Sequence, residues 1–168
     1  MGASTPLLEE EGEEHAAIGW EWRAQRLGWM VLALIVVAAL AGLFGTGPLS
    51  WSNASAADGS ISVEYPRFAR NGGPVALHLR VDPSAAAEGQ VRVVLSTGLL
   101  ESLEISRIVP EPESQASVDD GVVLTFALEG DTPLEATVSA TGDTMGRHDG
   151  ALGLDGEPPV EFWQFFYP

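Results

Sequence analysis

The sequence predicts a mainly β protein, in which one N-terminal transmembrane helix is followed by an exported antiparallel β-sandwich. Residues 27–45 form an uncharged apolar run of the length that crosses a bilayer. From residue 60 onward, short runs rich in β-branched and aromatic residues alternate with Gly, Pro or Asp turns, a pattern typical of antiparallel sheets. The organisation that we expect is a tail at 1–22, a membrane helix at 23–46, a linker at 47–59 and a β domain at 60–168.

The composition excludes several classes of protein. The 168 residues include 24 acidic side chains, eight Arg and no Lys, for a formal charge of −16. A surface this negative repels nucleic acid. The absence of Cys excludes disulfides, thiolate nucleophiles and cysteine-bound metals. The polar, acidic residues 1–22 predict a disordered tail.

The membrane helix is predicted from its length and its flanking charges. Leu27–Gly45 has 19 residues, and an α-helix of that length spans about 28 Å, close to the hydrocarbon thickness of a bilayer. Arg23 and Arg26 precede the helix, and the next basic residue is Arg67. The positive-inside rule therefore places the N-terminus in the cytoplasm and the C-terminal domain outside.

Several side chains of this segment have predicted roles at the membrane. Trp29 lies near one end of the helix and Trp51 just past the other, so both are expected in the headgroup layer together with Arg23 and Arg26. Small residues four apart let helices approach closely, and two such pairs are present: Ala38 with Gly42, and Ala41 with Gly45.

A cleaved signal peptide is the alternative interpretation of the same segment. Ala54-Ser55-Ala56 has the small residues of a cleavage site. The leader, however, is long and acid-rich, and the apolar run is longer than usual for a signal peptide. These features favour an uncleaved signal anchor, and under both interpretations the β domain is exported.

Seven strands are predicted after the linker, and apolar residues alternate along several of them. The runs are Ile61–Tyr65, Val75–Val81, Val91–Ser96, Leu103–Val109, Val122–Leu128, Leu134–Thr141 and Val160–Tyr167. A weaker eighth strand is expected at Ala151–Leu154, and residues 97–104 are expected either in a strand or in a helical turn that crosses between sheets. This number and spacing of strands predicts a sandwich of immunoglobulin-like type, with a small closed barrel as the alternative.

The C-terminal strand is unusually aromatic. It contains Phe162, Trp163, Phe165, Phe166 and Tyr167, so that both of its faces carry large apolar side chains. Because only one face of a sandwich strand meets the core, the other is normally polar. Two interpretations remain open: a central strand whose outer face is covered by loops, or an exposed patch that contacts a partner or the outer surface of the membrane.

One basic and aromatic cluster lies near the start of the domain. Arg67 and Arg70 flank Phe68, and such a cluster can contact anionic headgroups or an acidic partner. Pairing of these arginines with local carboxylates is the alternative.

Residues for catalysis or for a metal site are sparse. His15, His78 and His148 lack the spacing of zinc ligands, and no nucleophile elbow or phosphate-binding loop is present. We therefore expect no enzyme activity, no cofactor and no metal. Acidic residues in predicted loops could hold a cation or a glycan: Asp119, Asp120, Asp131, Asp143, Asp149 and Asp155.

Three fragments and the aromatic C-terminus resemble a family of uncharacterised bacterial single-pass membrane proteins. The fragments are Arg23–Trp29 (RAQRLGW), Gly47–Ser50 (GPLS) and Val63–Phe68 (VEYPRF). The resemblance implies this architecture, a bacterial setting and association with a multi-pass membrane protein, and it implies no activity. The function expected is that of an anchored, non-catalytic accessory protein on the outer face of the cytoplasmic membrane. The alternative is an extracytoplasmic ligand-binding module.

Overall fold

The computed structural model describes residues 7–40, 50–128 and 130–168, with the backbone alone for 7–21. The chain divides into two compact units, residues 1–41 and 42–168. The first contains the helix α1 (Leu7–Leu40), and the second contains eleven strands in two sheets. The protein is therefore mainly β with one N-terminal apolar helix, as predicted.

Helix α1 begins earlier than expected, because Leu7–Trp22 is helical where a disordered tail was predicted. Leu, Glu and Ala have high helix propensity and fill much of this stretch, whereas the prediction of a tail rested on its acidic composition rich in Gly and Ala and allowed an early start of the helix only as an interfacial turn near Ile18 and Trp22. Within α1, Trp22–Leu40 is the one described segment that is long and apolar enough to cross a membrane. A signal sequence has the same properties.

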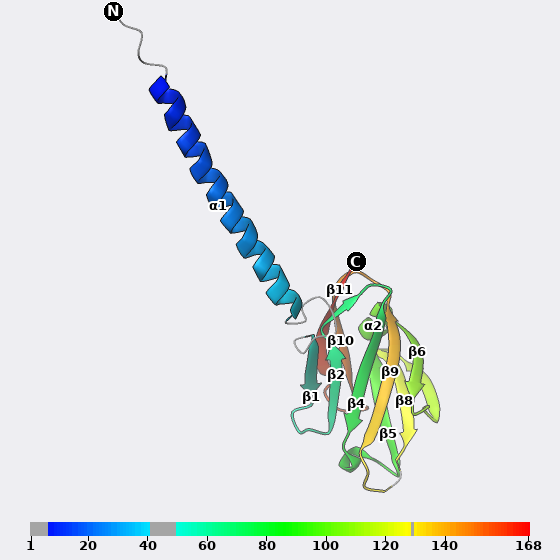
Figure 1. Ribbon diagram of the computed structural model, residues 1–168. Coiled ribbons are helices and arrows are strands. Elements are labelled where there is room, and N and C mark those ends of the chain that lie inside the picture. Colours follow the sequence, from blue (N-terminus) through cyan, green and yellow to red (C-terminus); the bar gives the residue numbers. More distant parts are fainter. Residues whose placement is uncertain (1–6, 41–49, 129) are drawn as a thin grey trace, which may run out of the picture. The chain divides into compact units, whose positions relative to one another are not determined.

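The first sheet has five strands. In spatial order these are β1 (Trp51–Ser55), β2 (Ile61–Pro66), β4 (Pro74–Val81), β9 (Leu134–Gly142) and β6 (Leu103–Val109). The second sheet has six strands: β3 (Phe68–Arg70), β11 (Val160–Tyr167), β10 (Gly146–Leu154), β5 (Gln90–Ser96), β8 (Gly121–Ala127) and β7 (Ser114–Val118). Figure 1 shows the sheets as two layers, with the arrangement of a sandwich.

All pairings are antiparallel except that between β3 and β11. The chain leaves the first sheet at Pro66 and joins the second at Phe68. A Pro without an amide hydrogen suits this crossing point, because it has no ladder bond to lose.

The core lies between the two sheets and follows the predicted alternation. Val75, Leu77, Leu79 and Val81 of β4 are buried, while His78 and Arg80 between them are exposed. The packing is close enough to require glycine opposite β11: a Cβ atom at Gly142 would lie 2.5 Å from Cδ1 of Phe166.

Two short helices connect strands at the sandwich ends. The 3₁₀ helix η1 (Pro83–Ala85) is capped by the Asp82 carboxylate. Helix α2 (Thr97–Ser102) fulfils one of the two expectations for residues 97–104. The Ser96 hydroxyl accepts a hydrogen bond from the Leu99 amide at 3.3 Å and caps this helix.

Three strands were not predicted. Strand β1 occupies five of the thirteen residues expected to be a linker. These five residues pair with β2 in continuous register, and the sequence of one segment does not show such a pairing. Strands β3 and β7 are short or polar and lie at sheet edges, where selection for apolar residues is weakest. Strand β10 begins at Gly146 rather than Ala151, so that His148 and Asp149 lie in a strand instead of a loop.

Candidate functional site

An aromatic and basic surface lies on the outer face of the second sheet. Outward-facing side chains of β11 and β10 meet Arg67, which connects β2 to β3, and Phe68, the first residue of β3. We call this the Trp163 surface, and it comprises Arg67, Phe68, Arg147, Trp163 and Phe165.

Trp163 is at the centre of these contacts. The guanidinium carbons of Arg67 and Arg147 lie 5.1 Å and 5.2 Å from its ring centroid, within the range of cation–π attraction. The Phe68 ring meets Trp163 edge-on at a centroid distance of 5.9 Å and Phe165 at 6.5 Å. Phe165 is 40% exposed, so this surface presents apolar and cationic groups together.

Arg67 is held in place from two sides. Its Nη2 donates a hydrogen bond to the Ser52 hydroxyl at 2.9 Å, and its backbone carbonyl accepts one from the Phe165 amide at 2.8 Å. Its Nε is buried and has no acceptor among the described residues. Arg147 instead pairs with Asp149 at 3.1 Å, so the Asp149 carboxylate offsets part of the positive charge around Trp163.

The predicted interaction residues of β11 separate by face. Phe162 and Phe166 are buried in the core, which removes them from any exposed patch. Trp163 and Phe165 point outward because neighbouring side chains of a strand alternate. Tyr167 is half-buried at the end of the strand.

Gln164 is buried on the same inner face, where a polar side chain is unexpected. Its amide Nε2 donates to the carbonyl of Pro66 at 2.9 Å, the position at which the chain leaves the first sheet. This bond satisfies a backbone acceptor at the crossing point. The sequence showed the polar residue in the apolar face but not its partner.

A groove lies at the end of the sandwich that contains Ser50, the first described residue of the β domain. We call it the Arg70 groove. It has a volume of about 460 Å³. Its lining includes Trp51, Pro66, Phe68, Arg70, Pro74 and Tyr167. Phe68 belongs to both surfaces, so the groove and the Trp163 surface are continuous. Of the predicted cluster, Arg67 and Phe68 join the Trp163 surface while Arg70 lines this groove.

The predicted membrane-interface residues fall in different units. Arg23, Arg26 and Trp29 are exposed on α1, and the Arg26 guanidinium lies over the Trp22 ring at 3.9 Å. Trp51 belongs to β1 and stacks on His78 at a centroid distance of 5.7 Å. For the predicted helix-packing pairs, Ala38 is half-buried in α1, whereas Gly42, Ala41 and Gly45 lie outside the described residues.

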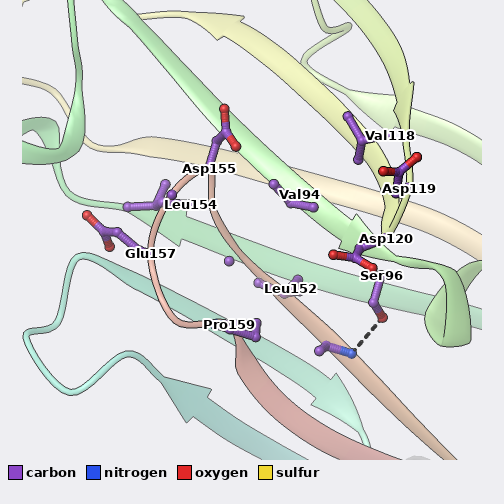
Figure 2. A pocket seen from close by; sticks show the side chains of 13 residues that line it. Val94, Ser96, Val118, Asp119, Asp120, Leu152, Leu154, Asp155, Glu157 and Pro159 are labelled. Carbon is purple, nitrogen blue, oxygen red and sulfur yellow. Dashed lines mark hydrogen bonds between the residues drawn. The ribbon is translucent and has the colours of Figure 1, made fainter.

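The acidic loops contribute to a separate pocket of about 440 Å³. Figure 2 shows Asp119 and Asp120 on one side of it and Asp155 and Glu157 on the other, with Val94 and Leu152 between. Asp155 is paired with Arg92 at 2.8 Å. Within the part of the chain that the structure describes, no group of three His, Asp or Glu side chains could hold a metal ion.

Two acidic turns illustrate how the described carboxylates are stabilised. The pKa of Asp58 is lowered, first by the backbone N–H of Ser60 and then by its hydroxyl, which donates at 2.8 Å. The pKa of Asp82 is lowered mainly by the Ser84 hydroxyl, which donates at 2.6 Å. Both are turn-forming contacts and do not indicate catalytic groups.

No protein-family model matches this chain, and no curated protein matches its sequence. The resemblance noted from the fragments around the helix therefore stays a prediction.

Proposed function

We propose that this protein is a membrane-anchored, non-catalytic accessory protein whose β-sandwich binds a multi-pass membrane protein. The observation that carries the proposal is the Trp163 surface. Trp and Arg are enriched at protein interfaces and frequently dominate binding energy. Here both residue types meet on an outer sheet face, beside a Phe165 side chain that is 40% exposed. A partner that covers Phe165 and Trp163 would gain apolar burial while the arginines contact its polar rim.

The location proposed is the outer face of a bacterial cytoplasmic membrane, with the N-terminus in the cytoplasm. An apolar segment of 19 residues at Trp22–Leu40 supports anchoring. Arg23 and Arg26 lie at its N-terminal end, and no Lys or Arg follows until Arg67, which supports this orientation.

We also propose that the sandwich is an immunoglobulin-like variant. The order β2-β4-β9-β6 of one sheet and β11-β10-β5-β8-β7 of the other corresponds to the neighbour order of variable-type immunoglobulin sheets. The chain order differs, because β6 follows β5 directly and the β7–β8 hairpin comes after it. The strands β1 and β3 are additional.

The test is purification of the tagged full-length protein from its native membrane in mild detergent, with mass spectrometry of co-eluting proteins. We expect a stoichiometric multi-pass protein with the wild type. Phe165→Ser is expected to lose most of it. Val118→Ser is the matched control, since Val118 is a similarly exposed (44%) apolar strand residue of the same sheet. A protein that reproducibly elutes alone, or equal loss in both folded variants, would contradict the proposal.

A second candidate function is binding of an extracytoplasmic cation or glycan. It is favoured by the pocket in Figure 2, which is lined by carboxylates from two segments distant in sequence, although among the described residues these do not form a group of three metal ligands. A ligand at 100 times its Kd stabilises the folded state by about 2.7 kcal/mol. Thermal denaturation of the full chain with and without Ca²⁺ measures this directly, and an unchanged Tm at millimolar Ca²⁺ would exclude a functional calcium site.

A further inference from the structure

The aromatic residues of the β-sandwich are distributed unevenly. Nine aromatic residues lie between positions 51 and 168. Four of them are core residues: Tyr65, Phe126, Phe162 and Phe166. The five that are not buried belong to the start of β1, to β3 and to β11 from Trp163 onward. These segments are adjacent at one end of the sandwich, where Trp51 pairs with Pro66 and Phe165 with Phe68.

Carboxylates of the connecting turns are more numerous at the opposite end than at this one, where the described turns after β2, β3, β5, β7 and β9 hold four: Glu101, Asp119, Asp120 and Asp143. The turns at the far end of the sandwich follow β1, β4, β6, β8 and β10, and their described residues include eight carboxylates and no arginine: Asp58, Asp82, Glu88, Glu111, Glu113, Asp131, Asp155 and Glu157. The Arg70 groove is lined by no carboxylate. Among the described residues, Arg80, Arg92 and Arg147 form ion pairs with carboxylates, and Arg70 forms none.

The groove also lies where the chain joins the sandwich. Ser50 lines it, and the Ser50 carbonyl accepts a hydrogen bond from the Arg67 amide at 2.6 Å. Only residues 41–49 separate Ser50 from Leu40, the last described residue of α1. Even a fully extended stretch of this length reaches no further than about 35 Å. If α1 is held in a bilayer, the groove is therefore kept within reach of that bilayer by covalent structure alone.

We infer that the Arg70 groove docks on the anionic phospholipid headgroups of the membrane that holds α1. This inference rests on the proposed anchoring. Trp and Tyr favour the headgroup layer because their rings are amphipathic, and Trp51 and Tyr167 both line the groove. An arginine near an anionic leaflet is attracted to it. The same surface repels the far end, with eight turn carboxylates, more strongly than the groove end, with four, so charge also favours docking through the groove.

Docking defines the orientation of the rest of the molecule. The Trp163 surface adjoins the groove through Phe68, so a docked sandwich presents Trp163 and Phe165 close to the plane of the membrane. A multi-pass partner is accessible at that height, whereas a ligand far from the bilayer is not. The groove therefore supplies the positioning that the proposed partner contact requires.

The test uses single cysteines, which are unique labels because the chain has none. Full-length protein carrying a nitroxide at Ser106→Cys, which lines the groove, or at Ala87→Cys, in the far-end turns, is reconstituted into nanodiscs. The nanodiscs contain phosphatidylcholine with or without phosphatidylglycerol, and no partner protein is added. We expect anionic lipid to protect position 106 from a water-soluble nickel quencher and to leave position 87 accessible.

Arg70→Gln and Arg107→Gln form the matched pair, since both remove one exposed arginine and Arg107 does not line the groove. Arg70→Gln is expected to lower the ratio of docked to free sandwich roughly fivefold, which corresponds to about 1 kcal/mol, and Arg107→Gln to leave it unchanged. Equal accessibility at positions 106 and 87 in anionic nanodiscs would overturn the inference. Protection that arises only when the co-purifying protein is added would assign the groove to a protein instead, and leave the proposed function standing.

Discussion

The two faces of strand β11 have almost the same aromatic content and opposite surroundings. On the inner face, Phe162 and Phe166 are buried, and the Tyr65 ring lies 4.6 Å from that of Phe162. On the outer face, Trp163 contacts two guanidinium groups, and Phe165 keeps 40% of its surface exposed. The inner rings therefore stabilise the fold, while the outer rings remain available for contact with another molecule.

The difference shows that hydrophobicity alone does not identify a core residue. Alternation assigns each aromatic side chain to a face, but burial depends on what the rest of the chain places above that face. The first sheet covers the inner face of β11. The outer face is shared only with the short β3 and the polar residues of β10.

The largest expected effect separates the two faces directly. Phe166→Ala should destabilise the protein by about 3–5 kcal/mol, because it removes a buried ring and leaves a cavity. Phe165→Ala should change stability by only about 0.5 kcal/mol, as is usual for surface positions. Urea unfolding of the full chain in detergent, followed by near-ultraviolet circular dichroism, measures both. Similar values for the two variants would show that the outer face is covered.

The next effect concerns the polar residue of the inner face. Gln164→Leu keeps the size of the side chain but leaves the Pro66 carbonyl without its 2.9 Å donor. A buried acceptor without a partner costs about 1–3 kcal/mol. The same unfolding experiment tests this, with Glu161→Gln on the exposed face as the control. Greater stability in Gln164→Leu would mean that the Pro66 carbonyl needs no partner.

A smaller effect is expected on the outer face. A double-mutant cycle with Arg147→Gln and Trp163→Leu isolates the interaction between the guanidinium and the ring. We expect a coupling free energy of about 0.5–1 kcal/mol, the range for exposed cation–π pairs. A coupling free energy of zero would indicate that Arg147 interacts with Asp149, its ion-pair partner at 3.1 Å, and not with the Trp163 ring.

The smallest expected effect is on the dependence of stability on pH. The inner face of β11 holds no carboxyl or imidazole group, so acid destabilisation must arise elsewhere. Asp58 and Asp82 have lowered pKa values. Their contribution is complete above the unfolded-chain pKa of about 3.9 and is lost as the pH falls through the lower folded-state pKa values. The double variant Asp58→Asn, Asp82→Asn should therefore show a shallower loss of Tm below pH 4, and an unchanged slope would contradict this assignment.

The success of the strand predictions depended on how each strand is buried. Strands β6 and β11 have the predicted bounds, and β2, β4, β5, β8 and β9 differ by a residue or two at their ends. Each carries enough apolar residues to be recognised alone. Strand β1 does not, since WSNAS is stabilised by pairing with β2. The pairing of two strands depends on both segments, so the sequence of either segment alone does not show it.

The candidate site was predicted in composition but not in geometry. The sequence indicated Arg67, Phe68, Arg70 and the aromatic strand as two separate features. The parallel pairing of β3 with β11 brings them together, with Phe68 opposite Phe165. Arg147 was missed, because it lay in a predicted loop and only the longer β10 places it over Trp163.

The sequence by itself determined the properties that depend on neighbouring residues: an apolar helix long enough to cross a membrane, the alternation of the main strands, and an acidic composition without cysteine. These follow from local periodicity and covalent chemistry. Only the tertiary structure decided which aromatic rings are covered, which sheet each strand joins, and that Arg67 and Arg147 meet on Trp163. Those outcomes depend on contacts between segments about a hundred residues apart, for example Pro66 with Gln164, and no local pattern encodes which distant segment will be the neighbour.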